Sequence, residues 1–455
     1  MVLFDELNWN FAEIVYLAII FFIGVIITYL IIPIIIRFMK RKHFIGYDIH
    51  KTSKPEVAES GGVSIVIGFS VVSIFLMIFF PSFFNLTLIF VLTVILSGII
   101  GFIDDRIRLK SRYKILLTLF TGVIIFIANF YGFIDIQSPV IPFLGQLRLT
   151  VIYPFLIPII VAVFANTVNM LEGYNGEGSG SCLIALLFLF ICGLLWNSTE
   201  AILFTIGAIS VILPFFLFNK YPAKVFPGDV GTLAMGSILA CIALFASLEA
   251  AVFCALLVHI FNSFYVLYSV KGFFESSDIQ DKKSDVILLK DDIIKASNQK
   301  EAALTLPRLI LAKGPLKENQ IVLNLYIISI VCGFFSIIAT LMMLGTLGMI
   351  NIYIILIVIV ILAAVTVILL YRFPQIRGII ILMIILLAAL CVLLFFIDLV
   401  IMPINFLNFN LFGITIPTNL IISFLLVIPV LLIWYYLTIR YFWKEIKSMS
   451  LKNQN

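Results

Sequence analysis

A polar run closes an apolar segment of membrane length in the stretch Asn166-Thr-Val-Asn169-Met-Leu-Glu172-Gly173-Tyr-Asn175-Gly176. Its side chains at positions 166, 169 and 172 recur at every third residue, so they share one arc of a continuing helix. The two glycines interrupt that helix and leave bare backbone that a ligand can approach. Amides and a carboxylate at membrane depth are costly and usually line a cavity. The stretch predicts a functional site at a helix end, although a polar terminus that only meets water would show the same pattern.

The composition indicates a polytopic membrane protein of the all-α class. Of the 455 residues, 63% are hydrophobic and 12% are charged, and the mean hydropathy is +1.22. Soluble proteins carry about twice that charged fraction. Apolar runs of about 20 residues, the length of a membrane-spanning helix, recur along the chain. We predict thirteen spans, at residues 11–36, 61–80, 84–103, 115–134, 149–170, 181–196, 200–218, 231–247, 250–269, 321–344, 348–371, 377–400 and 417–439.

The distribution of basic residues predicts the orientation of these spans. Lys and Arg near span ends prefer the cytoplasmic side of a membrane. With thirteen spans and the N terminus outside, 28 of the 29 Lys and Arg residues fall in inner loops. We therefore expect a multi-pass protein of the plasma membrane whose C terminus and polar loops face the cytoplasm. The longest inner loop, residues 270–320, mixes charged and apolar residues, which predicts either a partly helical element at the membrane interface or a flexible solvated linker.

The cysteines and histidines argue against a soft-metal or haem centre. The six cysteines all lie within apolar runs and form no CxxC pair, so we expect them to be small core residues. Three histidines in the whole chain are too few for a histidine-built zinc or haem site. We expect no nucleic-acid partner.

Charged residues in the first two inner loops are candidates for ligand binding. Lys51 and Glu59 lie in the first loop, below the start of the second span. In the second loop, Asp104 and Asp105 end an apolar run, and five cations including Lys114 follow. Adjacent residues of a helix point in different directions, so the two aspartates need not share one role. A desolvated carboxylate can also have a raised pKa that suits proton abstraction, whereas a salt-bridged loop is the ordinary alternative.

The inner loops together predict phosphoryl chemistry with a divalent metal. In the fourth inner loop, Pro-Gly favours a turn that presents Asp229 at the start of the eighth span, where an N-cap would also fit. Carboxylates and amides at these span ends are the hard oxygen ligands that Mg²⁺ or Mn²⁺ prefers. Lys51, Lys114 and Arg308 supply cations for phosphate groups. A metal-assisted phosphoryl transfer would use both sets.

At this point the sequence resembles a known family, the polyprenyl-phosphate N-acetylhexosamine-1-phosphate transferases of glycosyltransferase family 4. Four motifs carry the resemblance, in the order found in the family. They are Gly-Phe-Ile-Asp104-Asp105 with Lys114 nine residues on, Asn166-x-x-Asn169-x-x-Glu172-Gly-x-Asn175-Gly176, Phe226-Pro-Gly-Asp229, and more weakly Glu59-Ser-Gly-Gly62. The family moves a sugar 1-phosphate from a UDP-sugar to a polyprenyl or dolichyl phosphate, releasing UMP and leaving a lipid-linked pyrophosphate sugar.

The resemblance implies roles for individual residues. It implies Asn169 and Asp229 as the ligands of Mg²⁺, with Mn²⁺ as a substitute, and Lys114 as the pyrophosphate contact. It implies Asp104 and Asp105 as an acidic pair that assists attack by the lipid phosphate. By the same resemblance, the uridine is expected in a pocket of Gly173, Asn175 and Phe226. All the residues expected to bind substrate are Lys51, Glu59, Asn166, Glu172, Gly173, Asn175, Phe226 and Arg308.

Several departures from the family narrow the substrate. The branch that acts on a UDP-muramoyl-peptide carries histidines in the long inner loop, whereas residues 270–320 contain none. The eukaryotic Arg-His-Arg cluster is replaced by Ala303-Leu-Thr305, although Leu306-Pro-Arg308-Leu follows it as expected. Glu172 stands where bacterial relatives have Asp. These departures favour N-acetylglucosamine as the sugar and a role at the start of glycan assembly.

The resemblance divides the chain and leaves one alternative function. It covers about residues 1–345, which we expect to form a ten-helix transferase core, and residues 346–455 are expected to add three spans of unknown role. A transporter or flippase of a nucleotide sugar or lipid-linked sugar is the alternative. It predicts polar residues near mid-membrane, whereas the acidic groups here lie at inner span ends. Membrane lipid is an expected partner, and the chain could also form a homodimer.

Overall fold

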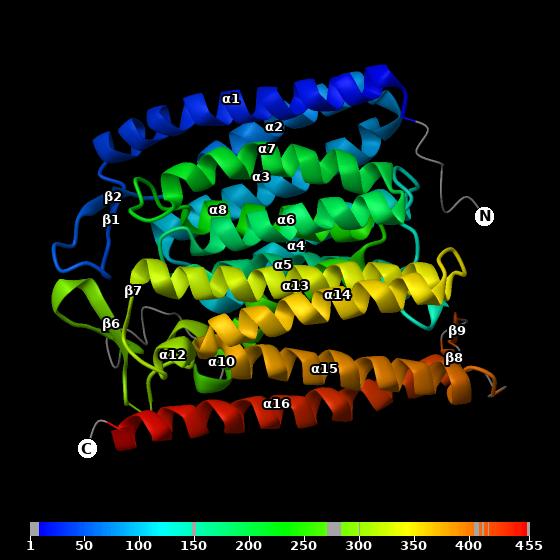
Figure 1. Cartoon of the computed structure of the whole chain (residues 1–455). Helices are drawn as coiled ribbons and strands as arrows, with labels where there is room; N and C mark the ends of the chain where they lie inside the picture. Colours follow the sequence, from blue (N-terminus) through cyan, green and yellow to red (C-terminus); the bar gives the residue numbers. More distant parts are fainter. Residues whose placement is uncertain are drawn as a thin grey trace.

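The structure is a computed structural model that describes residues 9–147, 152–270, 284–299, 301–404, 409–411, 414–416 and 418–452. Long helices run side by side in one slab, and short strands and loops gather at the helix ends (Figure 1). The hairpin of β1 (Ile45–Tyr47) and β2 (Glu56–Ala58) lies at one end of the slab. The pair of β8 (Phe409–Leu411) and β9 (Ile414–Ile416) lies at the opposite end.

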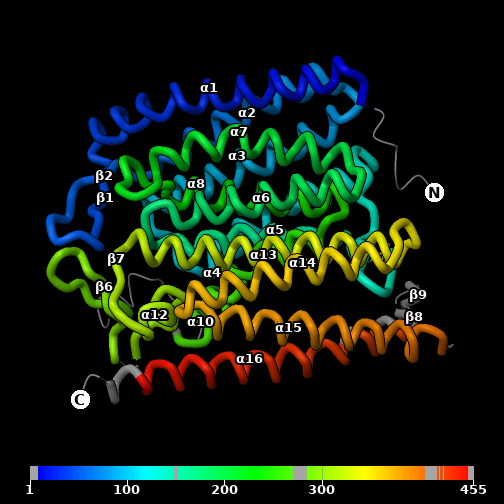
Figure 2. Tube along the Cα trace, viewed as in Figure 1, coloured from blue at the N-terminus to red at the C-terminus, as the bar shows by residue number. Residues whose placement is uncertain are grey.

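The trace in Figure 2 shows how the helices lie beside one another in space. They are α1 (Phe11–Arg41), α2 (Val63–Phe79), α3 (Phe84–Ile107), α4 (Ser111–Phe130), α5 (Ile152–Leu171), α6 (Glu177–Trp196), α7 (Thr199–Asn219), α8 (Gly228–Phe245), α9 (Glu249–Ala255), α10 (Leu257–Val270), α12 (Leu306–Leu311), α13 (Glu318–Thr346), α14 (Ile352–Arg372), α15 (Arg377–Phe396) and α16 (Thr418–Lys452).

The described helices confirm a helical membrane protein. Eleven of them are long and apolar enough to cross a membrane. A twelfth span results if α9 and α10, which are bent by 66° at their junction, are counted together, and α2 is a shorter apolar helix. Each of the thirteen predicted ranges overlaps one of these helices or the broken pair. The number thirteen and the orientation stay predictions.

The described part of the long inner loop is helical in part, as expected, through α12 and the single 3-10 turn Lys290–Asp292. The apolar runs from Val286 and Ile293 instead form strands of an antiparallel sheet. The sheet pairs β5 (Val286–Leu288) with β6 (Ile293–Ala296), and β6 with β7 (Leu316–Lys317). A short continuous apolar run fits a strand or a buried helix equally well, and here the backbone pairing shows strands. Residues 271–283 and 300 lie outside the described residues.

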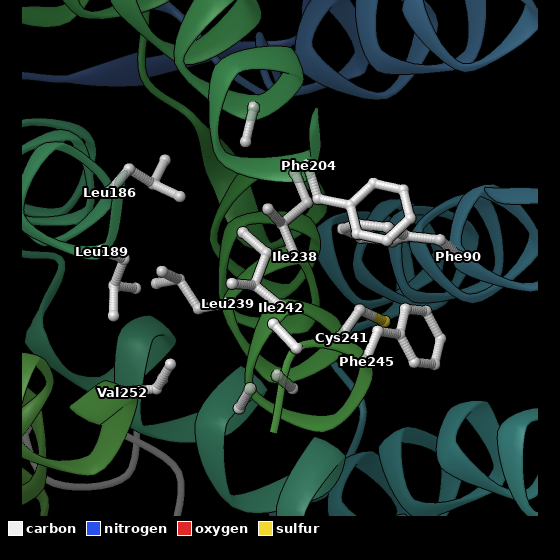
Figure 3. Close-up of a cluster of buried hydrophobic side chains, with 14 of the residues drawn as sticks. Phe90, Leu186, Leu189, Phe204, Ile238, Leu239, Cys241, Ile242, Phe245 and Val252 are labelled. Atoms are coloured by element: carbon white, nitrogen blue, oxygen red, sulfur yellow. The ribbon is translucent and has the colours of Figure 1, made fainter. Parts of the chain in front are cut away.

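Helix α8 occupies the centre of the first apolar core (Figure 3). Each of its residues from Val230 to Phe245 is buried, as expected of a helix that is apolar on all sides. Phe90 packs between two other rings, with its centroid 4.9 Å from that of Phe204 and 5.7 Å from that of Phe245. Because α8 is surrounded, its N-terminal end is held among the ends of the neighbouring helices.

A second apolar core crosses position 345, where we divided the chain. It joins buried residues of α10, α12 and α13 with residues of α15 and α16. Leu171 and Tyr174, which lie within the stretch of residues 166–176 quoted above, belong to the same core. The last helices therefore pack in one cluster with the end of α5.

Gly62 allows the starts of α2 and α8 to touch, and this contact can be tested. A Cβ atom at Gly62 would lie 2.1 Å from Cα of Gly231, and a backbone atom cannot move aside alone. We expect Gly62→Ala to lower the free energy of unfolding by about 1–3 kcal/mol through overpacking, measured as a lower melting temperature in detergent. Gly207→Ala is the control, since its nearest neighbour is a side-chain methyl at 3.2 Å. Equal melting temperatures for the two variants would contradict this packing account.

Candidate active site

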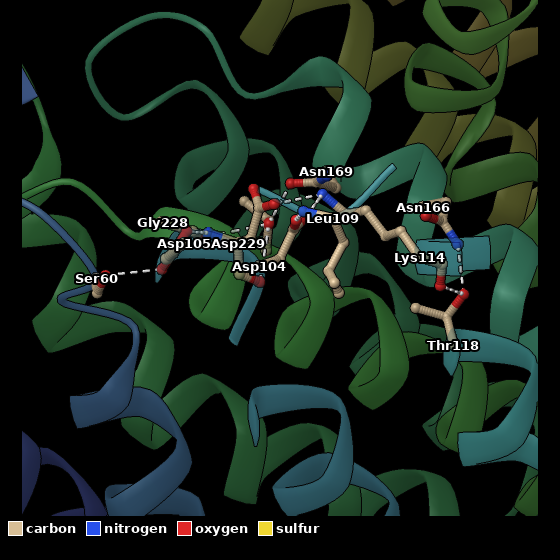
Figure 4. A network of polar contacts seen from close by, with 11 residues as sticks. Ser60, Asp104, Asp105, Leu109, Lys114, Thr118, Asn166, Asn169, Gly228 and Asp229 are labelled. Atoms are coloured by element: carbon tan, nitrogen blue, oxygen red, sulfur yellow. Dashed lines mark hydrogen bonds and ion pairs between the residues drawn. The ribbon is translucent and has the colours of Figure 1, made fainter. Parts of the chain in front are cut away.

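Four helix ends meet at the candidate active site. Asp104 and Asp105 lie in the last turn of α3, and Lys114 lies in the first turn of α4. Asn169 lies at the end of α5, and Asp229 lies at the start of α8. Figure 4 shows the side chains of Asp104, Lys114, Asn169 and Asp229 pointing toward one another, with Asp105 to one side toward Ser60. Five residues predicted from separate loops are thus brought together.

The ammonium of Lys114 lies between two carboxylates and an amide. Its Nζ is 2.6 Å from Oδ2 of Asp104 and also forms an ion pair with Oδ2 of Asp229. In the amide orientation that satisfies both polar atoms, the Asn169 oxygen accepts from Lys114 Nζ at 2.7 Å. The Asn169 nitrogen then donates to Asp229 Oδ1 at 2.9 Å. Three oxygen atoms from three helices therefore converge on one cationic nitrogen.

Asp105 faces away from this convergence and caps α8 from outside. Its Oδ1 accepts from the backbone N–H of Asp229 at 2.7 Å, and its Oδ2 accepts from Ser60 Oγ at 2.7 Å. The first N–H groups of a helix lack partners within it, so this carboxylate satisfies one of them. Gly228 has φ +63°, and a Cβ there would lie 2.4 Å from Asp105 Oδ2. The glycine is therefore needed for the carboxylate to approach.

Asp104 has a different set of partners. It is 6% exposed, and its Oδ1 accepts from the backbone N–H of Leu109 at 2.6 Å, just beyond α3. Its other oxygen faces Lys114. The two neighbouring aspartates therefore have different roles. Asp104 contacts Lys114, whereas Asp105 fixes the backbone that carries Asp229.

Asn166 lies on α5 one turn away from Asn169 but bonds elsewhere. Its Nδ2 donates to Thr118 Oγ1 and to the Ala162 carbonyl, both at 2.8 Å. The side chain therefore ties α5 to α4. Because α5 ends at Leu171, the predicted helical arc does not continue to position 172.

Two glutamates hold the turn between α5 and α6 in a reciprocal manner. Glu172 accepts from the N–H of Gly178 at 2.6 Å, in the first turn of α6. Glu177, which is fully buried, accepts from the N–H groups of Gly173 and Tyr174 at 2.9 and 3.0 Å. Each carboxylate satisfies backbone donors on the other side of the turn. The conformation of the predicted uridine pocket therefore depends on this pair.

Asn175 is a buried junction between three segments. Its backbone N–H donates to Glu318 Oε1 at 2.8 Å, and its Nδ2 donates to Asp48 Oδ2 at 2.9 Å. The same Asp48 oxygen lies 2.6 Å from Nζ of Lys51. Asp48 and Glu318 also lie with His50 close enough to share a cation, but their oxygens already serve Asn175 and Lys51. The network links the first inner loop to α13.

Glu59 and Phe226 are brought together by backbone pairing. The N–H of Phe226 donates to the Ala58 carbonyl at 2.8 Å, and its own carbonyl accepts from Gly61 at 2.9 Å. The Glu59 N–H donates to the Phe44 carbonyl at 3.0 Å. The first and fourth inner loops thus form one continuous edge beside α8.

Arg308 is placed differently from the other predicted residues. It is fully buried in the first turn of α12. Its guanidinium donates to the carbonyls of Ser297, Gln299, Ala302 and Ala303 at 2.6–3.2 Å. These five bonds use every N–H that an arginine side chain offers. In this structure Arg308 stabilises its own segment, and binding a phosphate would require breaking those bonds.

Sequence reasoning missed several residues that shape the site. Ser60, Asp48, Glu177 and Glu318 each bond to a predicted residue. Glu177 and Glu318 shared one signal, since each is the first residue of an otherwise apolar helix. The sequence could have predicted that each carboxylate begins a helix, but it could not have predicted the partner of that carboxylate in another loop.

The donor set of the centre fits a divalent cation. The carboxylates of Asp104 and Asp229 and the amide oxygen of Asn169 are hard ligands of the kind that Mg²⁺ binds. They already surround one positive charge, the Lys114 ammonium. A metal ion held by Asp229 and Asn169 would compete with this ammonium for the same oxygens.

Comparisons with known proteins show the family of the chain. The family model described as glycosyl transferase family 4 matches residues 87–247, a range that contains the whole convergent centre. A protein of Methanocaldococcus jannaschii named as a glycosyltransferase is 30% identical over 319 residues, covering 70% of this chain and 95% of the relative. A protein of Sulfolobus acidocaldarius, named as a UDP-N-acetylglucosamine–dolichyl-phosphate N-acetylglucosaminephosphotransferase, is 32% identical over 241 residues, 51% of this chain and 71% of the relative. A phospho-N-acetylmuramoyl-pentapeptide-transferase of Streptococcus pneumoniae is 29% identical over 266 residues, 54% of this chain and 80% of the relative.

The cap made by Asp105 can be separated from the chemistry of Asp104. We expect Asp105→Ala to lower the free energy of unfolding by about 0.5–2 kcal/mol, as loss of a helix cap does. Asp105→Asn, which keeps an acceptor for the Asp229 N–H, is expected to retain most of that stability. Thermal unfolding of the purified variants measures both. If the two variants were equally unstable, Asp105 would not act as an acceptor for α8.

The pKa of Glu172 gives a prediction for pH. Burial raises the pKa of this carboxyl from 4.5 to about 8. Between these values the folded protein binds more protons than the unfolded chain, so the free energy of unfolding falls as pH rises and levels off above about 8. Glu172→Gln cannot titrate and is expected to show a smaller fall in melting temperature between about pH 5 and pH 8. Glu56→Gln, at an exposed position, is the control and should follow the wild type; an unchanged slope in Glu172→Gln would contradict the assignment.

Proposed function

Because the chain belongs to glycosyl transferase family 4, we propose that it transfers N-acetylglucosamine 1-phosphate from UDP-N-acetylglucosamine to a polyprenyl or dolichyl phosphate. The products are UMP and a lipid-linked pyrophosphate sugar. The naming of the Sulfolobus relative supports this pair of substrates. The absence of histidine from residues 270–320 supports N-acetylglucosamine over a muramoyl-peptide sugar.

One observation carries the proposal, the convergence of Asp104, Asp229 and Asn169 on the Lys114 ammonium. A pyrophosphate bond is cleaved when charge on its oxygens is neutralised in a site that excludes water. Lys114 is 14% exposed and can exchange its carboxylate partners for the pyrophosphate of the donor. Mg²⁺ or Mn²⁺, held by Asp229 and Asn169, would supply Lewis-acid neutralisation of the same phosphates.

The transfer proceeds by attack of a lipid-phosphate oxygen on the phosphorus that carries the sugar. A new P–O bond forms to the lipid phosphate, and the bond from that phosphorus to the bridging oxygen breaks, so UMP leaves with the electron pair. A phosphate monoester is largely ionised near neutral pH, so the acceptor needs little help from a base. Asp104 therefore acts chiefly by orienting Lys114, and Asp105 by fixing the backbone of Asp229.

The surrounding loops support the binding of a nucleotide. Phe226 presents a ring that a uracil base can stack on, and it lies on the edge formed by the first and fourth inner loops. Gly173 and Asn175 lie in the turn held by Glu172 and Glu177. The basic inner loops support a site that faces the cytoplasm of the plasma membrane, and a homodimer is compatible with this placement.

The proposal is tested by incubating membranes that contain the protein with labelled UDP-sugars, Mg²⁺ and a polyprenyl phosphate. We expect a labelled lipid and UMP from UDP-N-acetylglucosamine, and an activity loss of at least about 100-fold in Asp229→Ala, as for removal of a group that stabilises developing charge. Chelation of divalent ions should abolish turnover. Asp135→Ala, which changes an exposed aspartate outside the candidate site, is the matched control.

Two outcomes would overturn the proposal. Full turnover by Asp229→Ala would refute the metal assignment. If no UDP-sugar gave a lipid product while vesicles took up a nucleotide sugar or moved a lipid-linked sugar across the bilayer, the protein would be the transporter or flippase considered above.

A further inference from the structure

The last helices of the chain contact the half-helix α10 through aromatic rings. The ring of Trp434 on α16 lies 4.6 Å from that of Phe261 and 5.9 Å from that of Phe264. One turn further along α10, the ring of Tyr265 lies 5.2 Å from that of Phe442 on α16. Trp434 is 3% exposed, so the contact between α16 and α10 lies in the packed interior of the protein. Figure 1 shows α16 and α15 running along the side of the slab that carries α10 and α12.

Helix α15 holds Trp434 in place from its other side. The indole N–H of Trp434 donates to the carbonyl of Leu382 on α15 at 3.1 Å. A buried tryptophan usually has a partner for this group, which also fixes the plane of the ring. The two helices therefore act on α10 as one unit.

Helix α10 needs such lateral support because its axis is broken. It begins at Leu257, after the 66° bend that separates it from α9. A helix that continues straight is held along its axis by its own hydrogen bonds, whereas a 14-residue half-helix after a kink is oriented mainly by what packs beside it.

The residue next to Phe261 connects α10 to α5, the helix that carries Asn169. Asn262 is 2% exposed, and its Nδ2 donates to the Met170 carbonyl at 2.7 Å. Its Oδ1 accepts from the N–H of Leu306 at 3.0 Å. Adjacent residues of a helix point in different directions, so α10 offers Phe261 to α16 and Asn262 to α5.

The Met170 carbonyl lies in the last turn of α5, beside Asn169. Carbonyls of a last turn have no partner within their own helix. Asn262 supplies the missing donor and so fixes the backbone immediately after the residue that contacts Asp229 and Lys114. The second apolar core extends the same linkage, because it contains Leu171 and Trp434 together.

We propose that α15 and α16 are a support for the active site, in which Trp434 orients α10 and Asn262 of α10 positions the last turn of α5. Trp434 and Asn262 are thus positioning residues. This gives the segment after position 345 a role in the transferase unit.

Hydrogen exchange of the purified full-length protein in detergent tests the support directly. We expect Trp434→Leu, which keeps apolar volume, and Asn262→Leu to speed amide exchange at least about threefold in the last turn of α5. Exchange in the buried middle of α8 should not change. Trp434→Phe, which keeps a ring against Phe261, should restore most of the protection. Leu432→Ala, at a site on α16 that is 61% exposed, is the matched control and should match the wild type.

The double variant shows whether the two residues act along one path. If they do, Trp434→Leu combined with Asn262→Leu changes exchange no more than the stronger single variant. Additive effects, or unchanged exchange at the end of α5 in folded Trp434→Leu, would overturn the proposal. If Trp434→Leu gave no monodisperse protein, the two single variants Asn262→Leu and Trp434→Phe would be compared by the same exchange measurement. Unchanged exchange at the end of α5 in Asn262→Leu would then overturn the proposal.

Metal binding is a second readout, and it rests on the function proposed above. With Mn²⁺ as the probe and paramagnetic resonance of the free ion as the measure, we expect Asn262→Leu to weaken binding about 10-fold, as loss of a group behind a metal ligand does. A merely unstable protein would bind fewer ions with unchanged affinity. Failure of the wild type to bind Mn²⁺ would count against the proposed function, whereas unchanged exchange would count against the support.

Discussion

The rest of the structure depends on one partly buried cation held by oxygens from three helices. Two carboxylates at the edge of a bilayer repel each other and lose solvation, so they are tolerated only when paired. Lys114 supplies the pairing for Asp104 and Asp229. The helix ends must therefore meet closely, and small residues permit this: a Cβ at Gly101 would lie 2.3 Å from the Asp229 carbonyl oxygen. The same convergence that stabilises the fold prepares a site for phosphates and a metal.

Two apolar cores position the helices that carry this centre. The first surrounds α8 and fixes the start of the helix that carries Asp229. The second contains α10, α13, α15 and α16 and reaches Leu171 at the end of the helix that carries Asn169. Hydrogen bonds from side chains then fix the exact positions of the helix ends, as Asp105 does for α8 and Asn262 does for α5. Packing thus brings the segments together, and a few buried acceptors and donors decide their register.

Much of the architecture was predictable, because apolar length and charge asymmetry are properties of single segments. The predicted ranges overlap the helices, and the motif residues Asp104, Lys114, Asn169 and Asp229 meet. Partners across loops were not predictable. Nothing local distinguished Asp104 from Asp105, since their roles differ only through Lys114 on one side and α8 on the other. Arg308 looked like a phosphate ligand, yet its donors are used by carbonyls of its own segment, and the strands after Val286 form only through pairing.

The most direct test of the central claim is an experimental structure of the protein with Mn²⁺ and UDP-N-acetylglucosamine bound, with the ion located by its anomalous scattering. The account predicts a manganese peak between Asp229 and Asn169, with the Lys114 ammonium moved from the carboxylates to the pyrophosphate of the nucleotide. A structure in which Lys114 still bridges Asp104 and Asp229 while the nucleotide and the ion bind elsewhere would contradict it.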